Sequence, residues 1–157
     1  MNRKGQAALE FLTTYAWAFL VILIMVGALA YFGILRPSKL LPDRCNFGSE
    51  FNCLDFRLQY TAQQANLRLQ NGVGETITVD SVSIFDDTGS ALCSNTNDVT
   101  HPSTNVTDYQ VTGCNFATAG YSDGEKGKVE VTITYYSVKS GPNYPHEVKG
   151  DIFTTIT

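Results

Sequence analysis

The sequence predicts an α+β protein, in which a long N-terminal hydrophobic α-helix precedes an all-β, immunoglobulin-like antiparallel sandwich. The helix is predicted because no charged residue occurs between Phe11 and Leu35. The sandwich is predicted because apolar and polar residues alternate with a period of two in short segments of the later chain. A chain of 157 residues has room for one such domain and an appendage.

The uncharged segment is long enough to cross a lipid bilayer. It predicts a helix of roughly 38 Å that is hydrophobic on all sides and ends at Arg36-Pro37. One interpretation is a membrane anchor for an external domain. A second is a secretory signal cut after Ala28-Leu29-Ala30, although the apolar run continues beyond that site. Arg3-Lys4 is the only basic pair before the run, which predicts a cytoplasmic N-terminus and an external remainder.

A third interpretation rests on the residues just before the helix. A short basic leader ends at Gly5, and Gln6-Ala7-Ala8-Leu9-Glu10 follows. This order resembles the class III signal peptide of archaeal type IV pilin-like proteins. That family has glutamine after the cleaved bond, serine two residues later, glutamate at the fifth mature position and leucine four further on. Gln6 and Glu10 match, whereas Ala8 replaces the serine and Thr14 replaces the leucine.

The resemblance implies a pilus subunit that polymerises into a cell-surface filament for adhesion. Residues 1–5 would be a leader that a prepilin peptidase removes between Gly5 and Gln6, and residues 6–35 would form the transmembrane and filament-core helix. It further implies that Glu10 meets the Gln6 α-amine of an adjacent subunit. The implied partners are further copies of the chain, a pilus assembly ATPase, a membrane platform protein and, before assembly, the membrane.

Three alternatives stay open at this point. Glu10 alone is also explained as a first-turn carboxylate, which the positive end of a helix dipole favours. The whole chain could be a monomeric, membrane-anchored β-sandwich that binds an external ligand. It could also be an archaellin-like subunit of a motility filament, which the glutamate at the fifth mature position disfavours.

The polar part of the chain begins with a connector at residues 36–44, which contains two prolines. A head domain at residues 45–157 follows, and its six or seven expected strands make up the sandwich. Ile77 and Val79 share one parity while Val82 and Ile84 take the other, so we expect a bulge near Asp80-Ser81. Clear alternation predicts strands around 55–60, 67–69, 77–84, 128–136 and 154–157, with turns at Asn71-Gly72, Asp86–Gly89, Asp123-Gly124 and Gly141–Asn143.

The four cysteines all lie in the head, and none belongs to a C-x-x-C pair. With only two histidines to add, they do not match the ligand spacings of a zinc site. An even number in an exported domain predicts two disulfides. Among the three possible pairings we favour the local ones, with four reduced thiols as the alternative for a cytosolic domain. The favoured pairs are Cys45–Cys53 and Cys93–Cys114.

The remaining features indicate an external, non-enzymatic domain. Beyond Leu35 the chain has 9 basic and 14 acidic residues, which argues against nucleic-acid binding. Asn105-Val106-Thr107 is an N-glycosylation sequon in a segment, Ser94–Thr107, that we expect to be a loop. Asp86-Asp87 and the Asp123–Glu125 segment lie in glycine-containing turns, where aspartate is expected for backbone hydrogen bonding. We therefore expect no catalytic residues, no metal site and no cofactor.

Overall fold

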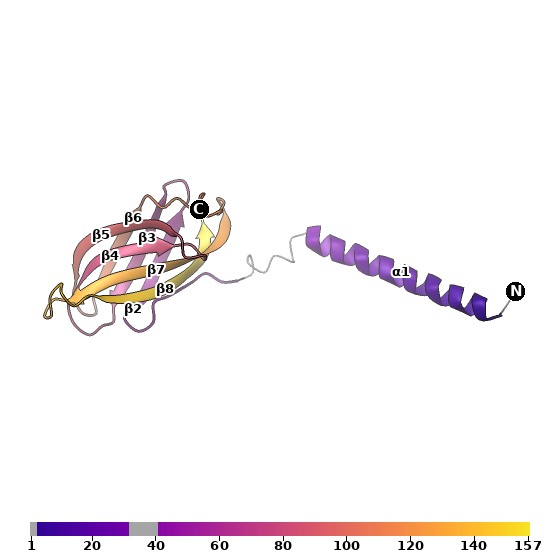
Figure 1. The fold of residues 1–157 in the computed structure, drawn as a ribbon, viewed down its shortest axis with the longest axis horizontal. Helices are drawn as coiled ribbons and strands as arrows, with labels where there is room; N and C mark the ends of the chain where they lie inside the picture. Colours follow the sequence, from indigo (N-terminus) through magenta and orange to yellow (C-terminus); the bar gives the residue numbers. More distant parts are fainter. Residues whose placement is uncertain (1–2, 32–40) are drawn as a thin grey trace. The chain divides into compact units, whose positions relative to one another are not determined.

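The computed structural model describes the backbone of residues 3–31 and 41–157, and the side chains of residues 10–31 and 41–157. The chain divides into two compact units, residues 1–41 and residues 42–157. The first contains the helix α1 (Arg3–Tyr31) and the second contains eight strands. The predicted α+β class is therefore confirmed (Figure 1).

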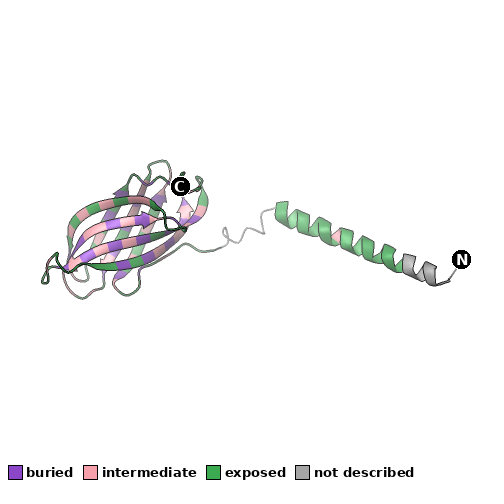
Figure 2. Ribbon diagram, in the orientation of Figure 1, coloured by how far each residue is buried: buried purple, intermediate pink, exposed green. Residues whose placement is uncertain are grey.

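Helix α1 is continuous over 29 residues. The side chains described from Glu10 onward are exposed or half-exposed, including Trp17 at 69% (Figure 2). The predicted helix end at Leu35 and most of the predicted connector, residues 36–40, lie outside the described residues. Arg44, which we placed in the connector, instead begins the first strand, because it pairs with Phe153.

The second unit is built from strands alone, eight where we expected six or seven. They are β1 (Arg44–Asn46), β2 (Phe51–Gln59), β3 (Gln64–Asn71), β4 (Ile77–Phe85), β5 (Ala91–His101), β6 (Val106–Thr112), β7 (Glu125–Ser137) and β8 (His146–Ile156). Their order is β5-β4-β7-β8-β2-β3-β6, with β1 paired to β8.

The strands form a sandwich-like arrangement because the sheet changes partner at β8. Strands β5, β4, β7 and β8 pair antiparallel along most of their lengths, and so do β2, β3 and β6. The link between the two groups is short and parallel, with Leu58 opposite Ile156 as its single residue pair. Strand β1 occupies the neighbouring stretch of the same β8 edge. The predicted sandwich is thus antiparallel except at this junction.

One apolar core lies between the two groups of strands. Inward-facing residues come from both, as Leu67 on β3 and Ile133 on β7 illustrate, and complete burial of such a side chain stabilises the fold by roughly 1.5–3 kcal/mol. Gly150 lets Phe47 cross β8 closely, since a Cβ at that position would lie 2.3 Å from the Phe47 ring. The largest fully buried apolar side chains are Phe47, Phe51, Phe116, Leu58, Leu67, Leu69, Ile77, Ile84, Ile133, Ile152 and Ile156.

The predicted bulge in the third alternating segment is confirmed. The register of β4 shifts between Val79 and Ser81 against both of its neighbours. The predicted loop at Ser94–Thr107 is wrong, because most of it belongs to β5 and β6, and only residues 102–105 connect them. The segment is rich in Thr and Asn residues, which are common in loops. Strand β5 nevertheless forms at the sheet edge, where backbone pairing with β4 needs few buried side chains.

The two disulfides are Cys45–Cys53 and Cys93–Cys114, the local pairings that we favoured. The second joins β5 to the segment after β6, at the two opposite edges of the sheet. Nearby, the Asn95 side-chain amide donates a hydrogen bond of 3.2 Å to the Gln110 carbonyl of β6. The disulfide therefore fastens the two layers on the side opposite the β8–β2 junction.

We predict that the Cys93→Ala/Cys114→Ala variant loses about 3 kcal/mol of unfolding free energy, because its closed loop spans 21 residues. The Cys45→Ala/Cys53→Ala variant, whose separation is 8 residues, should lose less. Denaturant unfolding of the full-length protein under non-reducing conditions measures both. A larger loss from the shorter loop would contradict the chain-entropy argument.

Candidate functional site

The predicted processing and assembly residues lie on one helix. Gly5, Gln6 and Glu10 all belong to α1, although only Glu10 has a described side chain. Because α1 begins at Arg3, its first turn contains no acidic residue. The interpretation of Glu10 as a first-turn carboxylate is therefore wrong for the chain with its leader, since the dipole effect fades beyond that turn.

Glu10 also marks the start of the segment that could span a membrane. Residues Glu10–Tyr31 form 22 residues of helix that are long and apolar enough to cross a bilayer. At 1.5 Å per residue they extend about 33 Å, close to the thickness of a hydrocarbon core. The hydroxyl of Thr14 donates a hydrogen bond of 2.9 Å to the Glu10 backbone carbonyl, so the hydroxyl has its hydrogen-bond acceptor within the helix.

The sequon asparagine lies in the short turn between β5 and β6. Asn105 is exposed, and its backbone is fixed by three hydrogen bonds. Its N–H donates to the Pro102 carbonyl at 3.2 Å, and its carbonyl accepts from the Asn71 N–H at 3.0 Å and from the His101 ring at 2.8 Å. The side chain therefore projects from a well-held backbone.

His101, which we expected in a loop, is a fully buried residue of β5. Because a carbonyl can only accept, the ring Nε2–H donates to Asn105 and Nδ1 accepts from the Tyr109 hydroxyl at 2.8 Å. The ring also faces Phe51, with centroids 6.1 Å apart. Burial lowers the pKa of His101 and raises the pKa of Tyr109, so both groups are neutral at physiological pH.

Asn71 joins the β5–β6 turn to the β3–β4 turn. Its side-chain amide donates to the Glu75 carbonyl at 2.8 Å and to the His101 carbonyl at 2.9 Å, and its side-chain oxygen accepts from the Val73 N–H at 2.9 Å. All these polar contacts lie at the β3–β4 and β5–β6 turns, on the same end of the sandwich. This end is thus a hydrogen-bonded unit centred on two buried polar side chains, Asn71 and His101.

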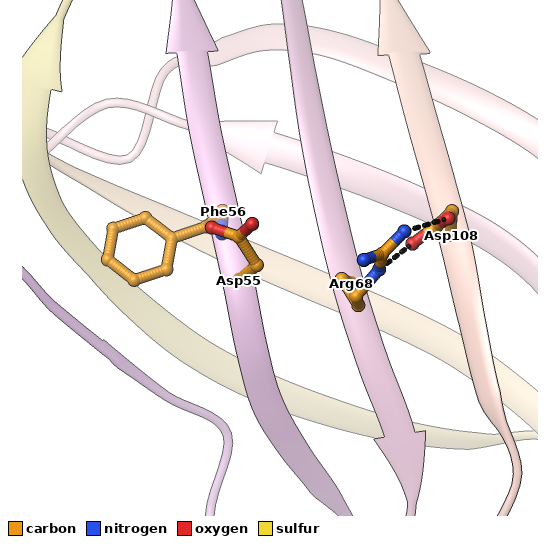
Figure 3. A network of polar contacts seen from close by, with 4 residues as sticks. All are labelled: Asp55, Phe56, Arg68 and Asp108. Carbon is orange, nitrogen blue, oxygen red and sulfur yellow. Dashed lines mark hydrogen bonds and ion pairs between the residues drawn. The ribbon is translucent and has the colours of Figure 1, made fainter.

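A second candidate site is the outer face of β2, β3 and β6, where polar side chains form rows across the strands. One row contains Asp55, Arg68 and Asp108 (Figure 3). Arg68 makes two hydrogen bonds to Asp108, at 2.7 and 2.8 Å. This pairing raises the pKa of Arg68 and lowers the pKa of Asp108. The negative charge of Asp55 also raises the pKa of Arg68.

Two further rows of this face carry amides. Arg57, Asn66 and Gln110 lie opposite one another on the three strands, and Gln59 and Gln64 form the next row. The amides are linked, because Gln110 donates to Gln64 at 2.7 Å and both Gln64 and Asn66 donate to Gln59. Sequence reasoning missed this face: alternation shows which residues point outward but not which strands lie together.

The outer face is hollowed between these rows. The hollow has a volume of about 560 Å³, within the range of small-ligand sites. Its lining is Asp55, Phe56, Arg57, Asn66, Leu67, Arg68, Asp108, Tyr109 and Gln110. Leu67 and Tyr109 are buried, so the accessible side chains of this hollow are mainly polar.

The aspartates of the predicted turns act on their own backbone. The Asp86 carboxylate accepts hydrogen bonds from the Thr88 hydroxyl and from the N–H groups of Thr88 and Ser90, at 2.7–2.9 Å, and these lower its pKa. Within residues 3–31 and 41–157, no three His, Cys, Asp or Glu residues are grouped so that they could hold a metal ion.

Comparison with protein-family models and with curated proteins finds no match. Among solved structures, the C-terminal domain of wzt aligns with a TM-score of 0.39 and 8% identity, over 73% of this chain and 78% of that one. A structural genomics target, SoR45, aligns with a TM-score of 0.37 and 13% identity, over 71% of this chain and 86% of that one. Likeness at this level carries no conclusion about the function of this chain.

We predict that the head loses stability as the pH falls from 7.5 to 5.5. Well above pH 6.5, His101 is neutral in the folded and unfolded chains. Below it, the unfolded chain binds a proton that the folded chain resists, so the free energy of unfolding decreases until the lowered folded pKa is reached. A tenfold difference in proton affinity corresponds to about 1.4 kcal/mol.

Denaturant midpoints of the full-length protein at the two pH values measure this effect. His101→Gln should flatten the dependence and lower the midpoint at pH 7.5, whereas His146→Gln, at an exposed residue, should leave the dependence intact. Equal midpoints for the unaltered protein at both pH values would show that His101 does not control the response.

Proposed function

We propose that this protein is a structural subunit of an archaeal type IV pilus, which polymerises through α1 into a cell-surface filament for adhesion. The observation that carries the proposal is the Gly5-Gln6 and Glu10 constellation on a helix whose apolar side chains are exposed from Phe11 to Tyr31. An external location agrees with the two disulfides of the head.

Polymerisation gives the helix surroundings that a single chain lacks. Phe11, Trp17 and Leu23 are examples of large apolar side chains that point in different directions around α1 and are all exposed. In the precursor, lipid can surround them. In a filament, α1 helices of other copies can do so, and small residues such as Gly27 and Ala28 allow helices to approach closely.

In this proposal Glu10 sets the register between neighbouring helices. Removal of residues 1–5 creates an α-amine on Gln6, four residues and about 6 Å along the axis from Glu10. A neighbouring helix displaced by one turn brings its amine level with this carboxylate. Among apolar helices an unpaired charge is costly, so filaments with the pair formed are favoured over other registers.

The proposed route defines the partners and location of the chain. A prepilin peptidase cuts the precursor, whose N-terminus is cytoplasmic. An assembly ATPase and a membrane platform protein then move the subunit from the bilayer into the filament. We also propose that Asn105 carries an N-glycan, as its exposed side chain allows. Peptide mass spectrometry that finds only unmodified Asn105 on purified filaments would exclude this modification.

A monomeric, membrane-anchored binding protein is the second candidate function. The hollow on β2, β3 and β6 favours it, since its volume of about 560 Å³ is within the range of small-ligand sites. The two candidates differ in the fate of the leader, because an anchored monomer keeps Met1 whereas a pilin does not.

We predict that the mature protein begins at Gln6. Mass spectrometry of the protein recovered from the cell surface measures its first residue. Gly5→Leu should block processing and leave Met1 in place, while Gly33→Leu, a matched change beyond the cleavage region, should not. A mature start at Tyr31 would instead indicate a secreted domain, and Met1 in the unaltered protein would indicate an anchor.

We predict that Glu10→Ala is processed normally but forms few or no filaments, because it leaves the neighbouring amine unpaired at a cost of about 3 kcal/mol per contact. Glu10→Gln should behave in the same way, since it keeps the size and removes the charge. Electron microscopy of the cell surface measures filament number. Glu130→Ala, at an exposed residue of β7, is the matched control, and normal filaments from both Glu10 variants would refute the pairing.

A further inference from the structure

We propose that the outer face of β2, β3 and β6 binds a neutral polysaccharide. The site is the hollow bounded by the Asp55–Arg68–Asp108 row and the Arg57–Asn66–Gln110 row. The proposal goes beyond the filament function and does not depend on it, because all the residues involved belong to the head.

The chemistry of the rows matches a hydroxyl-rich ligand. Asn66 and Gln110 each offer an amide donor and acceptor, and the Arg68–Asp108 pair presents fixed donors beside acceptors (Figure 3). A sugar hydroxyl both donates and accepts, so neighbouring hydroxyls can bind such alternating groups. The hydrogen bonds among Gln59, Gln64, Asn66 and Gln110 hold the amides in place before a ligand arrives, which reduces the entropy lost on binding.

The charges of the hollow favour a neutral ligand over a charged polymer. Asp55 and Asp108 balance Arg57 and Arg68 within the lining. The acidic excess of the chain beyond Leu35, 14 acidic against 9 basic residues, repels nucleic acid and acidic polysaccharides. A strongly basic partner would find two arginines in the site. Of these classes of ligand, only an uncharged one meets no like charge in the hollow or on the rest of the head.

The accessible apolar surface is too small for a protein partner of ordinary composition. Leu54 and Val106 are the large apolar side chains that remain about half exposed along the described parts of β2, β3 and β6. Protein interfaces have apolar and aromatic centres, whereas this hollow has amides and ion pairs. Neither of these two side chains lines the hollow, whose partly exposed aromatic residue is Phe56.

The test uses the full-length protein in lauryldimethylamine oxide, because detergents with sugar headgroups would compete for the site. Surface plasmon resonance measures binding to dextran and galactomannan as neutral probes, and to alginate and DNA as charged ones. We expect binding to at least one neutral polysaccharide that changes little between about 50 and 500 mM salt, since no net charge is involved. The Arg57→Ala/Gln110→Ala variant should bind at least about tenfold more weakly.

The matched control is Arg44→Ala/Asn143→Ala, which removes one arginine and one amide from exposed positions outside the hollow. It should bind like the unaltered protein, and so should unassembled Glu10→Ala, which separates this proposal from the filament function. Circular dichroism checks that each variant is folded. No binding to either neutral probe, binding to alginate or DNA alone, or equal loss in both double variants would overturn the proposal. So would concentration-dependent self-association that Arg57→Ala/Gln110→Ala abolishes.

Discussion

The apolar surface of α1 must be kept from water, and the functional interpretation of the chain depends on this constraint. Large side chains such as Phe11, Trp17 and Met25 are exposed in the single chain, and each would cost roughly 1.5–3 kcal/mol to leave in water. Lipid or the helices of other protein chains can cover these side chains. The same helix can occupy these two surroundings one after the other. A helix that is hydrophobic on every side suits a bilayer first and a bundle of identical helices later.

Contacts within the head are sufficient to hold its fold together, so its outer surface is available for binding. Its core is complete between the two groups of strands, and disulfides and the β8–β2 junction hold those groups together. Buried polar groups such as Asn71 and His101 are hydrogen-bonded to neighbouring turns, so they too need no partner. Under the proposed function, such a head would be stable both before and after assembly.

The sequence was informative where local pattern decides structure and uninformative where distant strands decide it. Strong alternation at Lys128–Tyr136 predicts β7, and the parity change after Val79 predicts the bulge of β4. Strand β5 was missed because its Thr and Asn residues are common in loops, and pairing with β4 outweighs that preference. The polar face was missed for a related reason: Arg68 and Asp108 are 40 residues apart, and only the strand order brings them together.

The position of Glu10 within α1 depends on whether the leader is present. While Arg3–Gly5 precede it, the carboxylate is beyond the first turn of α1, so the helix dipole gives it little support. Cleavage after Gly5 would bring the helix start to about one turn from Glu10 and would place a new positive charge there. The precursor and the cut chain would therefore differ in both the charge and the helix position of the same region. A carboxylate that gains a suitable counter-charge only after cleavage would restrict stable helix packing to processed subunits, which is the order of events that filament assembly from a membrane requires.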